Sequence, residues 1–129
     1  MEESILNSIK KLLGIQPEYT HFDQDLVIHI NSCFSTLHQL HVGTEEPFTI
    51  TGANESWAEF MLDETKIQSV KTYIYLKVKL LFDSTSMGAA TLAAYQDMIK
   101  EYEWRLNVAV DPPNEYPTPR VEEEVNWGD

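Results

Sequence analysis

The stretch KTYIYLKVKLLFD (71–83) decides the fold, because it fits two different secondary structures. Read alone, it alternates apolar and polar side chains, which is typical of a half-buried strand. In a wider window, apolar residues recur every three or four positions, as in an amphipathic helix. This pattern continues from about 66 to 82, longer than a strand of about 4 to 8 residues. We therefore predict a helix along one apolar stripe, formed by Ile67, Val70, Ile74, Val78 and Leu81.

Composition restricts the class of protein. The chain has 129 residues and a net charge of −12, which suits one domain and argues against a basic nucleic-acid-binding surface. Its one cysteine, Cys33, has no partner for an internal disulfide. The N-terminus lacks the basic start of a signal peptide, and no apolar run approaches the roughly 18 residues of a membrane helix. We expect a protein made in the cytoplasm that contacts no membrane.

Five further segments are predicted around this helix. A first helix spans about 2–13 and ends at Gly14, and a second follows a capping-box pattern at 20–23 and closes at Gly43. A short extended segment is expected at 47–52, followed by a short helix with Trp57, Phe60 and Met61 as core candidates. The last helix spans about 88–106. The expected apolar stripes are Ile5, Ile9 and Leu12 in the first helix, Phe22, Leu26, Ile30, Cys33, Leu37 and Leu40 in the second, and Leu92, Tyr95, Ile99, Tyr102 and Leu106 in the last.

These elements predict an all-α fold, a small bundle of about four to five helices over residues 1–106. From residue 107 onward the sequence contains four of the six prolines and six acidic residues against one arginine. Proline fixes φ and favours extended neighbours, so we predict an extended arm at 107–129. Val108 and Val110 alternate like a short strand that could add to an exposed sheet edge. The arm's candidate partner-binding residues are Val108, Val110, Tyr116, Val121, Val125 and Trp127. A disordered acidic tail that aids solubility remains an alternative.

Side chains suited to chemistry are few. His29, Cys33, His38 and His41 share the second helix and could in principle bind zinc, but ordinary packing and capping explain them better. The carboxylates are scattered over polar faces, and there is no phosphate-binding loop or nucleophile elbow. We expect no catalytic residues, metal or cofactor. Trp104 lies about 200° around the last helix from Tyr102 and away from the apolar stripe, which indicates a second apolar contact, such as one with another subunit.

Four blocks, in order, carry a family resemblance: ILNSIKKLLGI (5–15), FDQDLVIHINSCFSTLHQLHVG (22–43), KTYIYLKVKLLFD (71–83) and IKEYEWRLNV (99–108). The chain resembles the head–tail connector, or adaptor, proteins of long-tailed bacteriophages. The resemblance implies a helical, non-enzymatic virion protein at the head–tail interface.

By this resemblance, the subunit would form a ring of about twelve copies under the portal protein. The ring would extend the DNA channel, let DNA pass without specific binding, and provide a platform for the next head-completion or tail protein. The alternative function is an acidic phage inhibitor or DNA mimic, which would use dense surface carboxylates. Lysines interspersed among the acids on the helices weaken that alternative.

Overall fold

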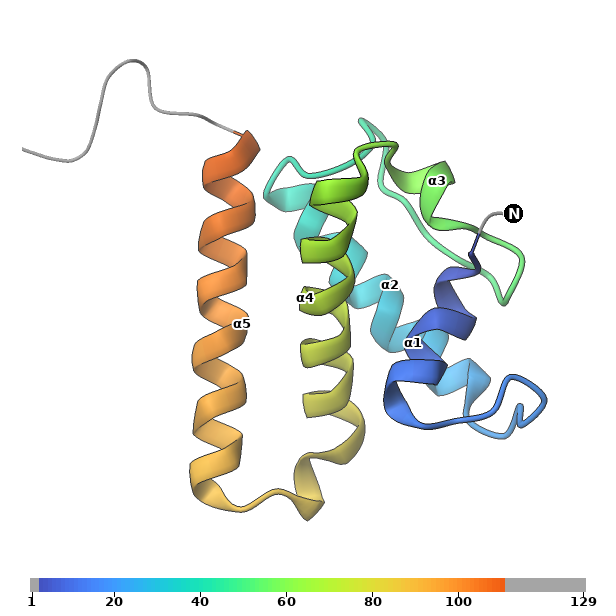
Figure 1. Ribbon diagram of the computed structural model, residues 1–129, viewed down its shortest axis with the longest axis vertical. Helices are drawn as coiled ribbons and strands as arrows, with labels where there is room; N and C mark the ends of the chain where they lie inside the picture. Colours follow the sequence, from blue (N-terminus) through green and yellow to red (C-terminus); the bar gives the residue numbers. More distant parts are fainter. Residues whose placement is uncertain (1–2, 111–129) are drawn as a thin grey trace, which may run out of the picture.

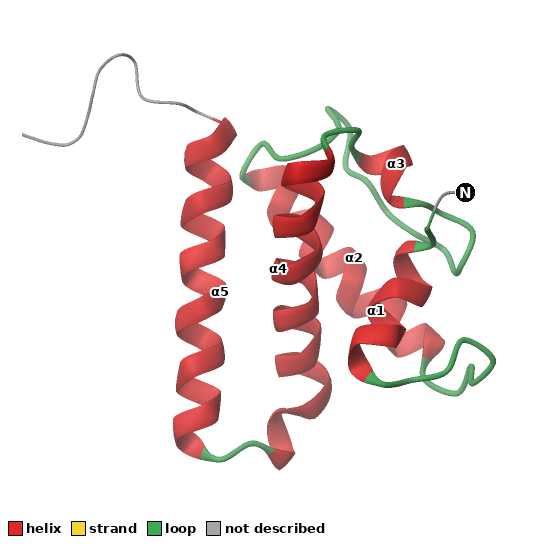
Figure 2. Ribbon diagram, in the orientation of Figure 1, coloured by secondary structure: helices red, strands yellow, loops and turns green. Residues whose placement is uncertain are grey.

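The computed structural model describes residues 3–110 as helices joined by loops (Figures 1 and 2). Within this range there is no β-strand, so the predicted all-α bundle is confirmed, and 71–83 is helical. The elements are α1 (Ile5–Leu13), α2 (Asp23–Gln39), α3 (Trp57–Phe60), α4 (Glu64–Asp83), the 3₁₀ turn η1 (Ser84–Ser86) and α5 (Ala89–Val110).

The central element is α4, which packs against α5 on one side and against α1 and α2 on the other (Figure 1). Its predicted stripe is buried, and Tyr73 and Leu76 on the neighbouring flank are buried too. This wide buried arc explains why a short window of the sequence imitates a strand: apolar side chains are needed on more than one face. Leu81 is the exception, because it is 46% exposed near the end of α4.

The first helix starts later than predicted and buries a charge. Ser4 caps α1 by accepting the amide proton of Asn7, and Gly14 ends it with φ 82°. Leu12, expected in the core, is 48% exposed, whereas the Lys10 side chain is buried. The Lys10 ammonium donates to the carbonyl oxygens of Pro17 and Tyr19, at 3.0 and 2.7 Å, because the loop after α1 folds back over it.

The predicted capping box at 20–23 does not form. Phe22 is the N-cap of α2 and makes no side-chain capping bond, while the carboxylate of Asp23 lies 2.8 Å from the Lys10 ammonium. Asp23 pairs with the Lys10 ammonium because an unpaired buried charge costs far more free energy than a helix N-terminus without a side-chain cap. The predicted end at Gly43 is wrong, because α2 ends at Gln39 and Leu40 is its C-cap. Gly43 lies in the loop that follows, with a φ of 100° and with the Phe60 ring where a side chain would project.

The segment at 47–52 is a loop that α2 holds in place. The side chain of Asn31 accepts from the amide of Ile50 at 2.8 Å and donates to its carbonyl at 3.0 Å. The amide side chain thus satisfies both backbone groups of a residue that is 1% exposed. The predicted short helix follows as α3, with Trp57 and Phe60 buried and Met61 partly buried.

The last helix is longer than predicted. The helix α5 continues through 107–110, so the reading of Val108 and Val110 as strand-like was wrong. Asn107 therefore does not end the helix. Val110 is the last described residue of α5, and the arm from 111 onward lies outside the described residues.

Candidate protein-binding surfaces

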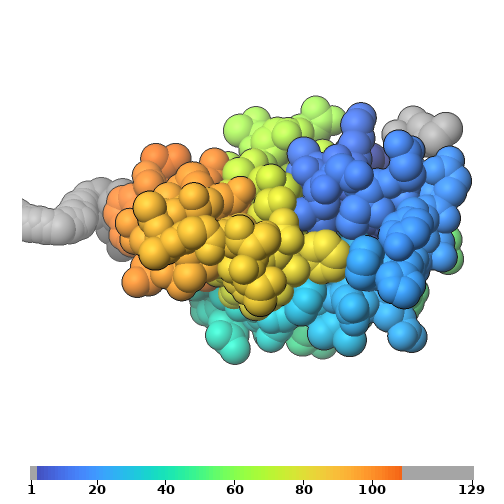
Figure 3. All heavy atoms as spheres, turned by 90° about the horizontal axis from the view of Figure 1, so that it is seen from below, coloured from blue at the N-terminus to red at the C-terminus, as the bar shows by residue number. Residues whose placement is uncertain are grey.

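The helix α5 stands at the edge of the molecule, with α4 as its main partner (Figure 1). The view from the end where α4 turns into α5 shows α5 to one side of the body formed by α1 and α2 (Figure 3). Of its described side chains, only Ile99 and Leu106 are fully buried. The predicted stripe also contains three partly buried residues, Leu92, Tyr95 and Tyr102.

Trp104 lies on the outward part of α5, as its angle on the helix predicts, and is 66% exposed. An indole exposed to this extent leaves a large apolar area in water. Near it, Arg105 and Glu101 form an exposed ion pair along the helix. Trp104 therefore has the geometry of an anchor for another protein, although its role as a partner-binding residue stays a prediction.

The inner face of α5 is fixed by polar contacts that the sequence did not reveal. The Tyr73 hydroxyl donates to Glu103 Oε2 at 2.8 Å. The Lys77 ammonium lies 3.2 Å from both the Tyr73 hydroxyl and Thr36 Oγ1, and 3.8 Å from Glu103. This Tyr73 cluster connects α2, α4 and α5, and it fixes α5 in register because hydrogen bonds are directional.

Burial raises the pKa of the Cys33 thiol and of the Tyr73 hydroxyl. Loss of hydration raises the pKa of the Cys33 thiol to about 12, with nearby Lys77 opposing and Glu103 adding to the shift. Burial likewise raises the pKa of Tyr73, and its hydrogen bond to Glu103 and that carboxylate's charge raise it further. Both groups are therefore protonated at neutral pH. A protonated, enclosed thiol is a poor nucleophile and a poor metal ligand.

The residues considered for zinc do not converge. Cys33 is buried in the core, His38 Nε2 lies 3.0 Å from the carbonyl oxygen of Glu45, and His41 adopts a left-handed φ of 64° just after α2. Within residues 3–110 there is no group of three His, Cys, Asp or Glu side chains that could hold a metal ion. His38 therefore contacts the loop that follows α2.

A shallow groove separates the C-terminal half of α4 from α5. It encloses about 400 Å³, and its lining includes Lys77, Leu80, Leu81, Ile99, Lys100 and Glu103. Its floor is aliphatic, and its two lysines come from different helices. We refer to it as the α4–α5 groove.

A second apolar surface was missed from the sequence. Leu62, between α3 and α4, is 84% exposed and borders a hollow of about 260 Å³ shared with Trp57, Met61 and Ile67. Trp57 itself belongs to the core, where its Nε1 donates to Ser8 Oγ at 2.8 Å. The sequence pattern did not indicate Leu62, because a single leucine in a loop is part of no helical or strand periodicity.

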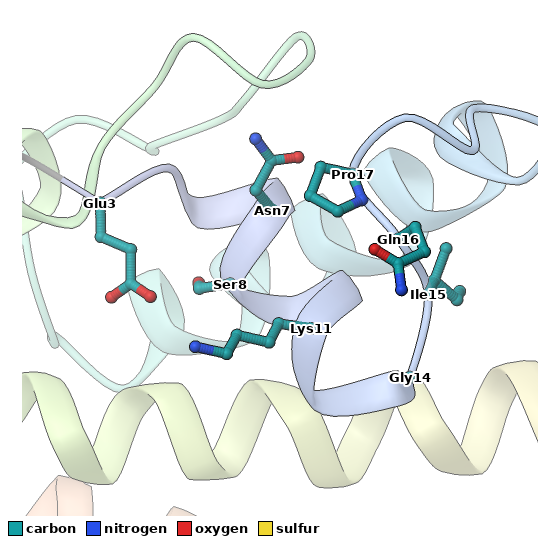
Figure 4. A pocket seen from close by; sticks show the side chains of 8 residues that line it. All are labelled: Glu3, Asn7, Ser8, Lys11, Gly14, Ile15, Gln16 and Pro17. Atoms are coloured by element: carbon teal, nitrogen blue, oxygen red, sulfur yellow. The ribbon is translucent and has the colours of Figure 1, made fainter.

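A hollow of about 520 Å³ lies between α1 and the loop after it (Figure 4). Ser8 and Lys11 are the chemically interesting side chains there. The Ser8 hydroxyl already donates to the Ile5 carbonyl oxygen and accepts from Trp57, so its role is to join α1 to α3. Glu3, at the rim, forms an ion pair with Lys71 at 2.9 Å. Because of these contacts, we assign the hollow to the packing of the N-terminal end of the molecule.

The predicted arm residues divide into two groups. Val108 lies in α5 and is partly buried, and Val110 is the last residue of that helix. Tyr116, Val121, Val125 and Trp127 lie outside the described residues. Because residues 3–110 contain no strand, the described body of a neighbouring copy offers no sheet edge to which an arm could add.

The comparison with known proteins covers nearly the same residues as the helical body. The model of a family described as phage connector protein matches residues 5–113, which is most of the chain. No curated protein and no solved structure gives a match. Among the described residues, no helix is long and apolar enough to cross a membrane.

Proposed function

We propose that this chain, which belongs to the phage connector protein family and is a structural component of the virion, acts as a ring-forming subunit at the head–tail junction. The ring would bind under the portal protein, extend its DNA channel and present a platform for the next head-completion or tail protein. The family match over 5–113 carries this proposal, because it spans the folded body rather than one motif.

Two features of the surface support self-association. A ring of identical subunits joined head to tail needs two different contact surfaces on each subunit. The chain has exposed apolar side chains at Trp104 on α5 and at Leu62 beside α3, and these two helices lie on opposite sides of α4 (Figure 1). Their separation suits a closed ring.

The charge supports a channel through which DNA moves. A net charge of −12 gives phosphate groups little to bind, so DNA would pass without being held. The proposal involves no catalytic step, cofactor or metal. It requires protein partners: the portal, the next head-completion or tail protein, and further copies of this chain.

The test combines light scattering of the free protein with capture on immobilised portal protein. We expect the full chain to bind portal and to assemble into a ring, and truncation after Val110 to leave a helical body that assembles or binds more weakly. Trp127→Ala should reproduce part of that loss. Tyr19→Ala, which changes another exposed aromatic residue, is the matched control.

A chain that stays monomeric and does not bind portal would contradict the connector role. If the truncated chain binds as tightly as the full chain, the arm is not an interface. The contacts would then be sought at Trp104 and Leu62, since Trp57 is buried.

A further inference from the structure

The α4–α5 groove has the chemistry of a site for an acidic, partly apolar peptide. Leu81 is 46% exposed beside the buried Ile99, so the groove leaves aliphatic surface in water. Lys77 and Lys100 supply positive charge from its two sides. Lys77 is engaged by Glu103, but Lys100 has no ion-pair partner within residues 3–110.

The chain itself contains a matching segment. Residues 121–127 read VEEEVNW, with three consecutive carboxylates between Val121 and Val125 and with Trp127 following. The segment contains no basic residue that would oppose Lys100. Apolar anchors beside acids complement an aliphatic groove edged by lysines, which favours this pairing over a basic or wholly polar partner.

The position of the segment favours a groove on another copy. The last described residue of α5 is Val110, beyond Glu103 at the end of the groove, so a segment entering the groove of its own chain would have to turn back along α5. Residues 111–120 include four prolines. Pro-rich spacers favour extended geometry of about 3.1 Å per residue, which would carry residue 121 some 30 Å onward.

We propose that residues 121–127 of one copy bind the α4–α5 groove of a neighbouring copy. This rests on the proposed ring, and it adds the site and the ligand of one subunit contact. The apolar side chains would cover Leu81, and the carboxylates would pair with Lys100 and supplement Glu103 at Lys77. A row of such contacts would link each subunit to the next.

Directed disulfide formation between full-length chains tests this contact. A Leu81→Cys variant is mixed with a Val125→Cys variant under mild oxidation, and linked peptides are identified by mass spectrometry. Cys33 does not compete, because it is buried. The control replaces Leu81→Cys by Ile28→Cys, at a side chain that is 65% exposed on α2. We expect the 81–125 link to form on the order of tenfold faster than the 28–125 link, because docking raises the local thiol concentration.

Charge reversal provides a second measurement. Lys100→Glu should slow the 81–125 link several-fold, and Glu123→Lys in the partner chain should restore part of the rate. Lys11→Glu, at an exposed lysine on α1, makes the same charge change away from the groove and should have little effect.

Each outcome separates this inference from the connector role. Rings that bind portal without a preferred 81–125 link would overturn groove docking and leave the connector role intact. A preferred link in a chain that fails to bind portal would support groove docking and contradict the connector role. Absence of self-association, or a link formed only within single chains that carry both cysteines, would overturn docking between copies.

Discussion

The helices α4 and α5 have 20 and 22 residues, yet the protein uses them differently. The helix α4 is enclosed over a wide arc, with Val70, Tyr73, Ile74 and Val78 at 0% exposure. The helix α5 contacts the body along one narrow face and leaves Met98 and Trp104 exposed. The lesson is that helices of similar length can serve as core or as surface, depending on how many neighbours cover them.

The largest change in stability is expected from a charge in the core of α4. Ile74→Asp should lower the free energy of unfolding by more than about 4 kcal/mol, because it buries an unpaired carboxylate. The matched change on the exposed surface of α5, Ala94→Asp, should alter it by less than about 0.5 kcal/mol. Urea titration of both variants would measure the difference. An unchanged midpoint for Ile74→Asp would mean that α4 is not buried.

The hydrogen bonds that join the two helices give a smaller effect. Tyr73→Phe removes the hydroxyl that donates to Glu103, and we expect a loss of about 1 to 2 kcal/mol of stability because the carboxylate loses a partner. Tyr19→Phe, at a half-exposed ring, is the control and should be nearly neutral. Hydrogen exchange of the α5 amides should rise in Tyr73→Phe. Equal stability of the two variants would show that the cluster does not hold α5.

The buried thiol beneath α4 predicts a loss of stability at alkaline pH. Its pKa is raised from 9.0 to about 12 by folding, so above about pH 9 the unfolded chain releases a proton that the native chain retains. The unfolded state is then favoured increasingly, and stability should fall by up to about 1.4 kcal/mol per pH unit. Urea midpoints between pH 8 and 10 would measure the slope. Cys33→Ala should flatten it over this range, and an unchanged slope would assign the effect to other groups.

The smallest expected effect on stability is at Trp104. Trp104→Ser removes a mostly exposed ring, so the free energy of unfolding should change by less than about 0.5 kcal/mol, and any loss should appear in self-association. Trp57→Ser, at a ring that is 4% exposed, should cost about 3 kcal/mol or more. Thermal unfolding and light scattering on both variants would check this. A strongly destabilised Trp104→Ser would place the ring in the core.

Local sequence patterns are enough to place the helices and the end of the first one. Apolar spacing located α4, Gly14 marked the end of α1 where a left-handed φ is required, and Trp104 was correctly placed off the apolar stripe of α5. These features depend on neighbours along the chain, such as helical period and local backbone geometry.

Only the tertiary structure decided which lysine is buried and which polar groups meet. Lys10 and Lys11 are adjacent and chemically alike, but only Lys10 faces the loop carbonyls and Asp23. Tyr73 and Glu103 are 30 residues apart, and their hydrogen bond exists because α5 folds back along α4. The α4–α5 groove likewise requires both helices. Such features depend on contacts between distant segments, and helical periodicity specifies only which face of each segment is apolar.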